Sequence, residues 1–151
     1  NALRQPPVPF TVTGEMPAAL PEPRSTATLT LGEMMITLAE GALVAGENLI
    51  RIDNVGAQPH FVDFQRLPDG MTKANVEATL QMEMGATPEA EVIDFAQLRP
   101  LGGTTDQSGG TTVWFAVTLE AGPVAALCFV PDEASGLPHA AMGMYEVFEI
   151  A

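Results

Sequence analysis

Only one cysteine, two histidines and six basic side chains occur among the 151 residues, against 19 acidic ones. A single cysteine excludes an internal disulfide and the cysteine-rich sites that hold structural zinc or iron–sulfur clusters. The formal charge of -13 leaves no basic face for nucleic acid and disfavours contact with anionic membrane surfaces, since both repel an acidic protein. No apolar run reaches the roughly 18 residues of a membrane-spanning helix, so direct membrane insertion is not expected.

What is present predicts one folded domain preceded by an arm. With 46% hydrophobic and 17% charged residues, the chain is apolar enough to form a core, and its length suits a single domain. Residues 1–26 contain six prolines and are expected to form an extended arm or linker with one short strand at Phe10–Thr13, while residues 27–151 form the domain. The chain starts at Asn1 rather than methionine, which suggests a processed or shortened form that lacks upstream sequence.

Apolar residues that alternate with polar ones from position 27 onward indicate β-strands. The clearest is Thr111–Leu119, in which every second residue is a large apolar one. Asn48–Val55 shows the same period, with Ile50 and Ile52 on one face. The other expected strands are Ala27–Leu31, Met34–Leu38, Phe61–Phe64, Val124–Val130 and Tyr145–Ile150.

One segment has helical periodicity instead. Thr72–Met84 has apolar residues at helical spacing and is followed by Gly85 as a stop signal, and Thr87–Glu89 resembles the start of a second helix. The glycine-rich segment Leu101–Gly110 lacks the lysine of a phosphate-binding loop and is expected to be an ordinary connection. Together these patterns predict an all-β protein, a mostly antiparallel β-sandwich of about seven or eight strands with a helical insertion near residues 71–99.

The residues with the most distinctive chemistry lie near the C-terminus. Cys128, His139 and two methionines share one turn-rich loop between two expected strands. A thiolate, an imidazole and a thioether suit a soft metal, whereas Mg²⁺ or Ca²⁺ would require oxygen ligands. A second imidazole would complete a trigonal site of two histidines and one cysteine with a weak axial methionine, which is the type 1 copper arrangement. Because His60 is the only other histidine, it is the candidate for that position.

The spacing Cys-x₁₀-His-x₄-Met, with a histidine far upstream at the start of a strand, resembles the cupredoxins, the blue copper proteins. The resemblance covers about residues 30–150, and Asn54–Phe64, where a proline precedes His60, is similar to the plastocyanin pattern. The long interval between Cys128 and His139 is closer to copper nitrite reductase domains than to plastocyanin or azurin. The family implies a Greek-key β-sandwich and one type 1 copper per chain, held by these three residues and an axial methionine.

Two methionines compete for the axial position, and the family keeps apolar inward residues four and six positions after it. Counting from Met144 gives Phe148 and Ile150, which are both apolar. Counting from Met142 gives Glu146, which is a poor core residue. Met144 is therefore the predicted axial ligand.

The resemblance implies an electron-transfer protein rather than an enzyme, cycling between Cu(I) and Cu(II) outside the cytoplasm, in the periplasm or tethered at the cell surface. His139 would be the solvent-side route for the electron. A small apolar patch around it would dock a neutral or cationic redox partner protein; its members are Leu137, Pro138, Ala140 and Ala141. The chain departs from the family at Phe61, where many cupredoxins have an asparagine that ties the ligand loops together. The family pattern therefore does not predict which groups form hydrogen bonds around the thiolate, although the ligand set is unaffected.

Other functions compete with electron transfer. One is a copper carrier or sequestration protein without redox turnover, and another is a copper-free cupredoxin-like binding module. A hydrolase with Cys128 as nucleophile and His139 or His60 as base lacks an oxyanion-hole motif. Zinc could occupy the same three ligands, but the methionine would then have no purpose. Two histidines are too few for the extra copper centres of multicopper oxidases and nitrite reductases.

Overall fold

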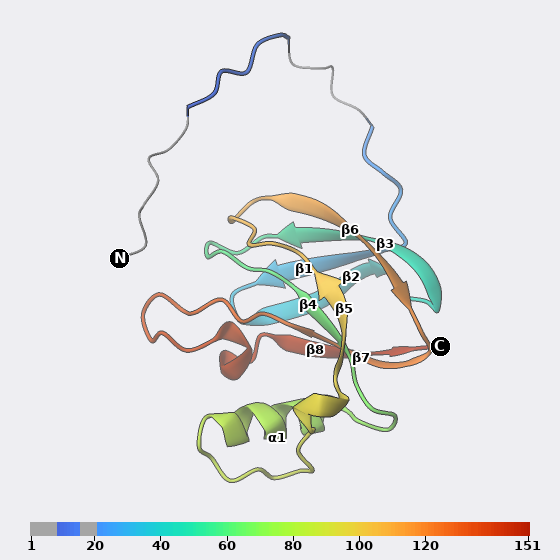
Figure 1. The fold of residues 1–151 in the computed structure, drawn as a ribbon, viewed down its shortest axis with the longest axis vertical. Helices are drawn as coiled ribbons and strands as arrows, with labels where there is room; N and C mark the ends of the chain where they lie inside the picture. The colour runs from blue at the N-terminus through green and yellow to red at the C-terminus, as the bar shows by residue number, and fades with distance from the viewer. Residues whose placement is uncertain (1–8, 16–20) are drawn as a thin grey trace.

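Two four-stranded β-sheets pack face to face in the computed structural model, which describes residues 9–15 and 21–151 (Figure 1). The first sheet has the order β2–β1–β3–β6, with bounds Met35–Gly41, Ala27–Gly32, Gly46–Asn54 and Thr112–Leu119. The second sheet has the order β5–β4–β7–β8, with bounds Arg99–Gly103, Asp63–Arg66, Gly122–Leu127 and Tyr145–Ile150. Neighbouring strands are antiparallel except for β1 and β3, which are parallel. The predicted all-β sandwich is confirmed.

Strand alternation builds the core between the two sheets. In β3, Ile50 and Ile52 are buried and lie opposite Phe115 and Val113 of β6. In β4, Phe64 is fully buried, and its ring stacks on that of Phe115 with 5.5 Å between the centroids. Burying side chains of this size stabilises the fold by about 1.5–3 kcal/mol each. This apolar layer therefore determines how the sheets sit on each other and which strand ends meet.

The predicted helix is present as α1 (Lys73–Glu83) and lies on the outer side of the second sheet (Figure 1). A capping box between Thr72 and Asn75 closes its first turn. Gly85 follows its end with φ +82°, a left-handed conformation that favours glycine. Because the helical segment covers the outer face, β7 is buried on both of its faces from residue 123 to residue 127.

The second helix expected from Thr87–Glu89 is wrong. The chain is irregular there, and the nearest helical structure is a single 3₁₀ turn at Phe95–Gln97. The intervening residues bury only Ile93, so a helix would have no continuous apolar face to pack on the sheet.

The expectation of an ordinary connection at Leu101–Gly110 is also wrong in part, because β5 (Arg99–Gly103) pairs with β4 at the sheet edge. This edge strand has no hydrophobic alternation, since Pro100 and two glycines occupy it. At Gly103 a β-carbon would lie 2.2 Å from the carbonyl oxygen of Val62, so the close approach of the two strands requires glycine.

The expected N-terminal arm lies partly outside the described residues, which omit 1–8 and 16–20. Within residues 9–15 no strand forms, so the strand expected at Phe10–Thr13 is wrong; its apolar side chains are exposed and no neighbouring strand pairs with them there. The first strand begins at Ala27. Within the part of the chain that the structure describes, no helix is long and apolar enough to cross a membrane.

Candidate metal centre

The loop that joins β7 to β8 folds back on itself and brings its functional residues together. Cys128 directly follows β7, and its backbone N–H donates to the carbonyl of Met144 at 3.1 Å. Its carbonyl accepts from the N–H of Ala140 at 2.6 Å, and the N–H of Met144 donates to the carbonyl of His139 at 2.9 Å. These backbone bonds hold the cysteine, the histidine and the methionine of the predicted motif on one compact turn.

The upstream histidine is positioned from a different part of the chain. His60 forms a two-way backbone bridge with Gln107, with N···O distances of 3.0 and 2.8 Å. The buried side chain of Asn54, at the end of β3, donates to the carbonyls of Gln58 and Gln107 at 2.9 and 2.8 Å. It also accepts from the N–H of Gly56 at 3.0 Å. Asn54 therefore ties the His60 turn to the Gln107 loop.

The structure brings three of the predicted site residues into one buried cluster. His60, Cys128 and His139 are each 0% exposed. The two Nδ1 atoms are 3.1 Å apart, and the cysteine Sγ lies 3.9 Å from that of His60 and 3.7 Å from that of His139. A point in the plane of these atoms lies about 2.1 Å from each, which matches the bond lengths of about 2.0–2.3 Å that a first-row metal makes to imidazole and thiolate.

A hydrogen bond at Nε2 of His139, the ring nitrogen that faces away from the cluster, determines the tautomer of this histidine. Its Nε2 lies 3.2 Å from Oε1 of Gln58, whose Nε2 in turn donates to Oδ1 of Asp132 at 3.4 Å. Because the carboxylate holds the Gln58 amide with its oxygen toward the ring, the His139 proton belongs on Nε2. The lone pair of Nδ1 then points at Cys128, which is the orientation that a metal ligand needs.

A carboxylate faces the outer nitrogen of His60. Its Nε2 is 4.0 Å from Oε1 of Glu33, whose carboxylate accepts from the backbone N–H groups of Ala57 and Gln58. These two amides, Gln58 first, hold the pKa of Glu33 below its usual range. At Gly56 a β-carbon would lie 2.6 Å from Glu33 Oε1 and 3.0 Å from His60 Nε2, so glycine permits this approach.

The protonation chemistry of the cluster fits a metal ion. Burial, with a smaller contribution from His139, lowers the pKa of His60, so its imidazole is neutral and can donate a lone pair. Burial raises the pKa of Cys128, while the backbone amides of Phe61 and Val130 act against that shift and favour the thiolate. With the His60 proton on Nε2, two lone pairs and the sulfur converge within 4 Å on one point in a dry pocket, where a cation can accept all three. The donor set therefore fits the type 1 copper arrangement.

The two methionines have different surroundings. Met144 is fully buried in the same core cluster as Cys128. Met142 is 39% exposed, and its sulfur accepts a hydrogen bond from the hydroxyl of Ser135. In β8, Ile150 is buried and Phe148 packs against the core, as the register argument for Met144 requires.

Two features differ from the sequence-based expectations. His139 has no exposed edge, because Gln58 covers its outer nitrogen. Ala140 is also buried, so it cannot belong to an apolar docking patch. The side chain of Gln58 makes the tie between the ligand loops that Phe61 cannot make, because it reaches His139 and Asp132. Gln107, which supplies the His60 bridge, carries no sequence signal for this role.

Asp132 organises the long ligand loop and gives it a predicted pH dependence. Its carboxylate accepts from the amide and hydroxyl of Ser135, both at 2.8 Å, and from the amide of Ala134 at 3.1 Å. These bonds, the Ser135 amide first, hold the pKa of Asp132 below its usual value. The charged form therefore stabilises the fold above about pH 4, and this contribution is lost as the pH falls through the lowered pKa.

We expect Asp132→Asn to lower the unfolding temperature of the metal-free protein at pH 7 more than at pH 3. Thermal unfolding followed by circular dichroism at the two pH values measures this difference. Glu133→Gln, which alters an exposed acid of the same loop, is the matched control and should change little at either pH. An equal loss at pH 3 and pH 7 for Asp132→Asn would show that its charge is not involved.

Comparison with known proteins identifies the fold. No protein-family model and no curated protein matches the chain. Among solved structures, it is similar to dithionite-reduced auracyanin from the photosynthetic bacterium Roseiflexus castenholzii, with a TM-score of 0.52 and 19% identity over 82% of this chain and 94% of that one. Auracyanin A from Chloroflexus aurantiacus, described as a "blue" copper protein, aligns with a TM-score of 0.48 and 20% identity over 82% of this chain and 98% of that one. Auracyanins are cupredoxins, so the first likeness confirms the predicted cupredoxin-like Greek-key sandwich.

Proposed function

We propose that this chain with the cupredoxin fold is an electron-transfer protein that binds one type 1 copper through His60, Cys128 and His139, with Met144 as the axial ligand. The observation that carries the proposal is the buried triangle of two Nδ1 atoms and one Sγ, with edges of 3.1, 3.7 and 3.9 Å. When bound, copper would supply a one-electron couple between Cu(I) and Cu(II).

The residues around the triangle support repeated electron transfer because they are held rigidly. Gln58 orients the ring of His139, and Asn54 with Gln107 fixes the turn that carries His60. Ligands that cannot move between two oxidation states keep the reorganisation of the site small. The apolar core around Cys128 also excludes water from the sulfur.

Burial distinguishes this function from the alternatives. A hydrolase would need its nucleophile to meet a substrate, but the sulfur of Cys128 is fully buried. A copper carrier needs ligands that can exchange their metal with a partner, and all three candidate ligands are inaccessible. These observations favour a resident metal in a protein that is not an enzyme.

The electron would leave through the surface around the ligand loop. Gln58 is half-buried and covers His139, and Leu137 and Met142 are exposed beside it. A redox partner with a neutral or cationic docking face suits a chain of formal charge -13. By its resemblance to the cupredoxins, the protein would work outside the cytoplasm.

Replacing Met144 should change the copper site, whereas replacing Met142 should not. We expect Met144→Leu to shift the midpoint potential and the visible spectrum, because a thioether that contacts the metal would be replaced by an inert side chain. A tenfold change in the ratio of Cu(I) to Cu(II) affinity corresponds to about 59 mV for one electron. Voltammetry of both variants measures the shift. An unchanged potential in Met144→Leu with a shift in Met142→Leu would reverse the assignment.

Voltammetry of the copper-loaded wild-type protein tests electron transfer itself. We expect a reversible one-electron wave and complete, repeatable reduction and reoxidation without release of copper. Stoichiometric copper binding without a reversible wave would identify a sequestration protein instead. Failure to bind copper at all would identify a copper-free binding module.

A further inference from the structure

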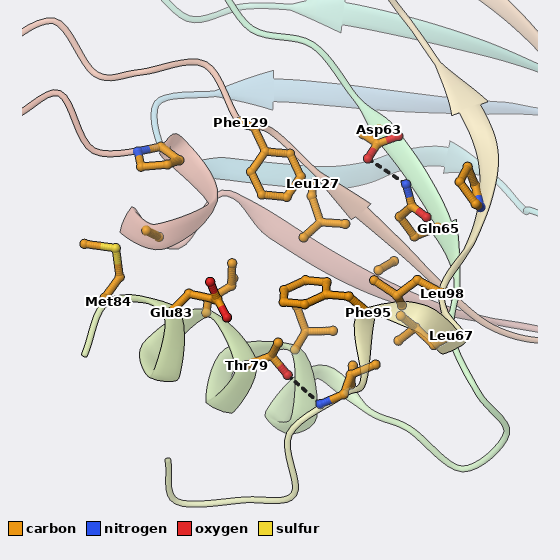
Figure 2. Close-up of a pocket in the computed structure, with 17 residues that line it drawn as sticks. Asp63, Gln65, Leu67, Thr79, Glu83, Met84, Phe95, Leu98, Leu127 and Phe129 are labelled. Carbon is orange, nitrogen blue, oxygen red and sulfur yellow. Dashed lines mark hydrogen bonds between the residues drawn. The ribbon is translucent and has the colours of Figure 1, made fainter. Parts of the chain in front are cut away.

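A pocket of about 440 Å³ lies between α1 and the outer face of the second sheet (Figure 2). The electron-transfer proposal does not use it. Its floor is formed by alternate residues of β4 and β7. The residues between them lie on the opposite face of the sheet and point into the main core. The helical segment forms the opposite wall. The volume falls within the range of about 300–1,000 Å³ that is typical of small-molecule sites.

The small side chain of Ala125 on the floor leaves space between the sheet and the helical segment. Ala125 of β7 is fully buried beneath the helical segment, and Leu127 lies two residues further along the same face. On the helix side, Val76 and Leu80 contribute apolar walls. An apolar space of this kind holds water poorly, so an apolar ligand gains free energy by entering it.

Two aromatic rings border the pocket and are unusually exposed for their size. Phe95 is 54% exposed and Phe129 is 41% exposed. Figure 2 shows them extending into the same space from the helix side and the sheet side, with Leu127 between them. A planar aromatic ligand between these rings would bury both and could stack on either of them.

The polar groups of the lining determine the charge that a ligand can carry. Asp63 and Glu83 supply carboxylates, and none of the described lining residues is basic. The side-chain amide of Gln65 is held on the floor by a 2.8 Å hydrogen bond to Asp63 and provides a neutral polar contact. An anion would meet repulsion from these carboxylates and from the net charge of the chain.

We propose that this pocket is a binding site for an aromatic small molecule that carries no negative charge. It shares a wall with the candidate metal centre, because Leu127 and Phe129 flank Cys128 and Pro138 precedes His139. The proposal goes beyond electron transfer and does not depend on copper binding, so the two can be tested separately.

The test uses two fluorescent probes with the same ring system, on the full chain with and without copper. N-phenyl-1-naphthylamine is neutral, and 8-anilinonaphthalene-1-sulfonate carries a negative charge. We expect the neutral probe to bind saturably with one molecule per chain, and the sulfonate to bind at least about tenfold more weakly, equivalent to about 1.4 kcal/mol.

Three variants assign the binding to this pocket. Ala125→Leu fills the floor and should abolish binding of the neutral probe. Phe95→Ala removes one ring and should weaken binding about tenfold. Phe10→Ala removes an even more exposed phenylalanine that does not line the pocket, and it should leave binding unchanged.

The proposal is overturned if the neutral probe fails to saturate, if the sulfonate binds as tightly, or if both pocket variants bind like wild type. Circular dichroism shows whether Ala125→Leu is folded. If that variant unfolds, the comparison of Phe95→Ala with Phe10→Ala decides, because neither substitution touches the buried core. Equal binding by those two variants would then reject the pocket.

Discussion

Replacing Cys128 with serine is expected to abolish the visible absorption band of the copper-loaded protein. The band requires electron density to pass from a thiolate to the metal, and this chain has no other sulfur of that kind. Copper affinity should also fall by more than about 100-fold, because even residues that only orient a ligand contribute 10–100-fold. Absorption spectroscopy and a competitive copper-chelator titration measure the two effects.

The matched control is Ala126→Ser. Ala126 lies two residues before Cys128 on the same face of the chain, in the same buried cluster. Both substitutions place a hydroxyl in one apolar environment, so both carry a similar folding penalty. Only Cys128→Ser should lose the band. If both variants lost it, the cause would be a disturbed core, and if neither did, the thiolate would not be a ligand.

Replacing Asn54 with alanine is expected to lower the free energy of unfolding by about 3 kcal/mol and to weaken copper binding as well. The change removes three hydrogen bonds of a buried side chain, each of which contributes about 1 kcal/mol. It also frees the Gln107 loop from the turn that carries His60. Copper affinity should therefore fall by about 10–100-fold, as for other residues that position a metal ligand.

Asn48→Ala is the control, because Asn48 makes an equivalent set of bonds on the same strand, away from the site. Its side chain donates to the carbonyls of Val44 and Gly46 and accepts from the N–H of Val44. Chemical denaturation should show similar losses of stability for the two variants. A similar loss of copper affinity in Asn48→Ala would mean that general destabilisation, rather than the position of His60, controls the metal site.

The sequence was sufficient to predict the sandwich, helix α1 and the three clustered residues. Strands with apolar alternation, such as β3 and β6, could be found because one face is buried against the other sheet. Cys128 and His139 could be found because their spacing places them on one loop. His60 followed because the chain contains no third histidine.

Other features could not be predicted because they depend on contacts between distant segments. The edge strand β5 is defined by its partner β4 and contains glycine and proline in place of alternating apolar residues. The bridge between His60 and Gln107 joins two loops without a local signal. The burial of His139 results from Gln58, which lies on the turn before His60. Positions of this kind are set by tertiary structure, whereas local patterns identify only the strands that alternate apolar and polar residues.

Titration of the metal-free protein with Cu(II), followed by visible absorption, tests the central claim most directly. The geometry of His60, Cys128 and His139 predicts an intense thiolate-to-copper band that grows linearly and stops at one copper per chain. Copper that binds without this band, or a band that continues to grow beyond one equivalent, would contradict the assignment of these residues as a single type 1 site.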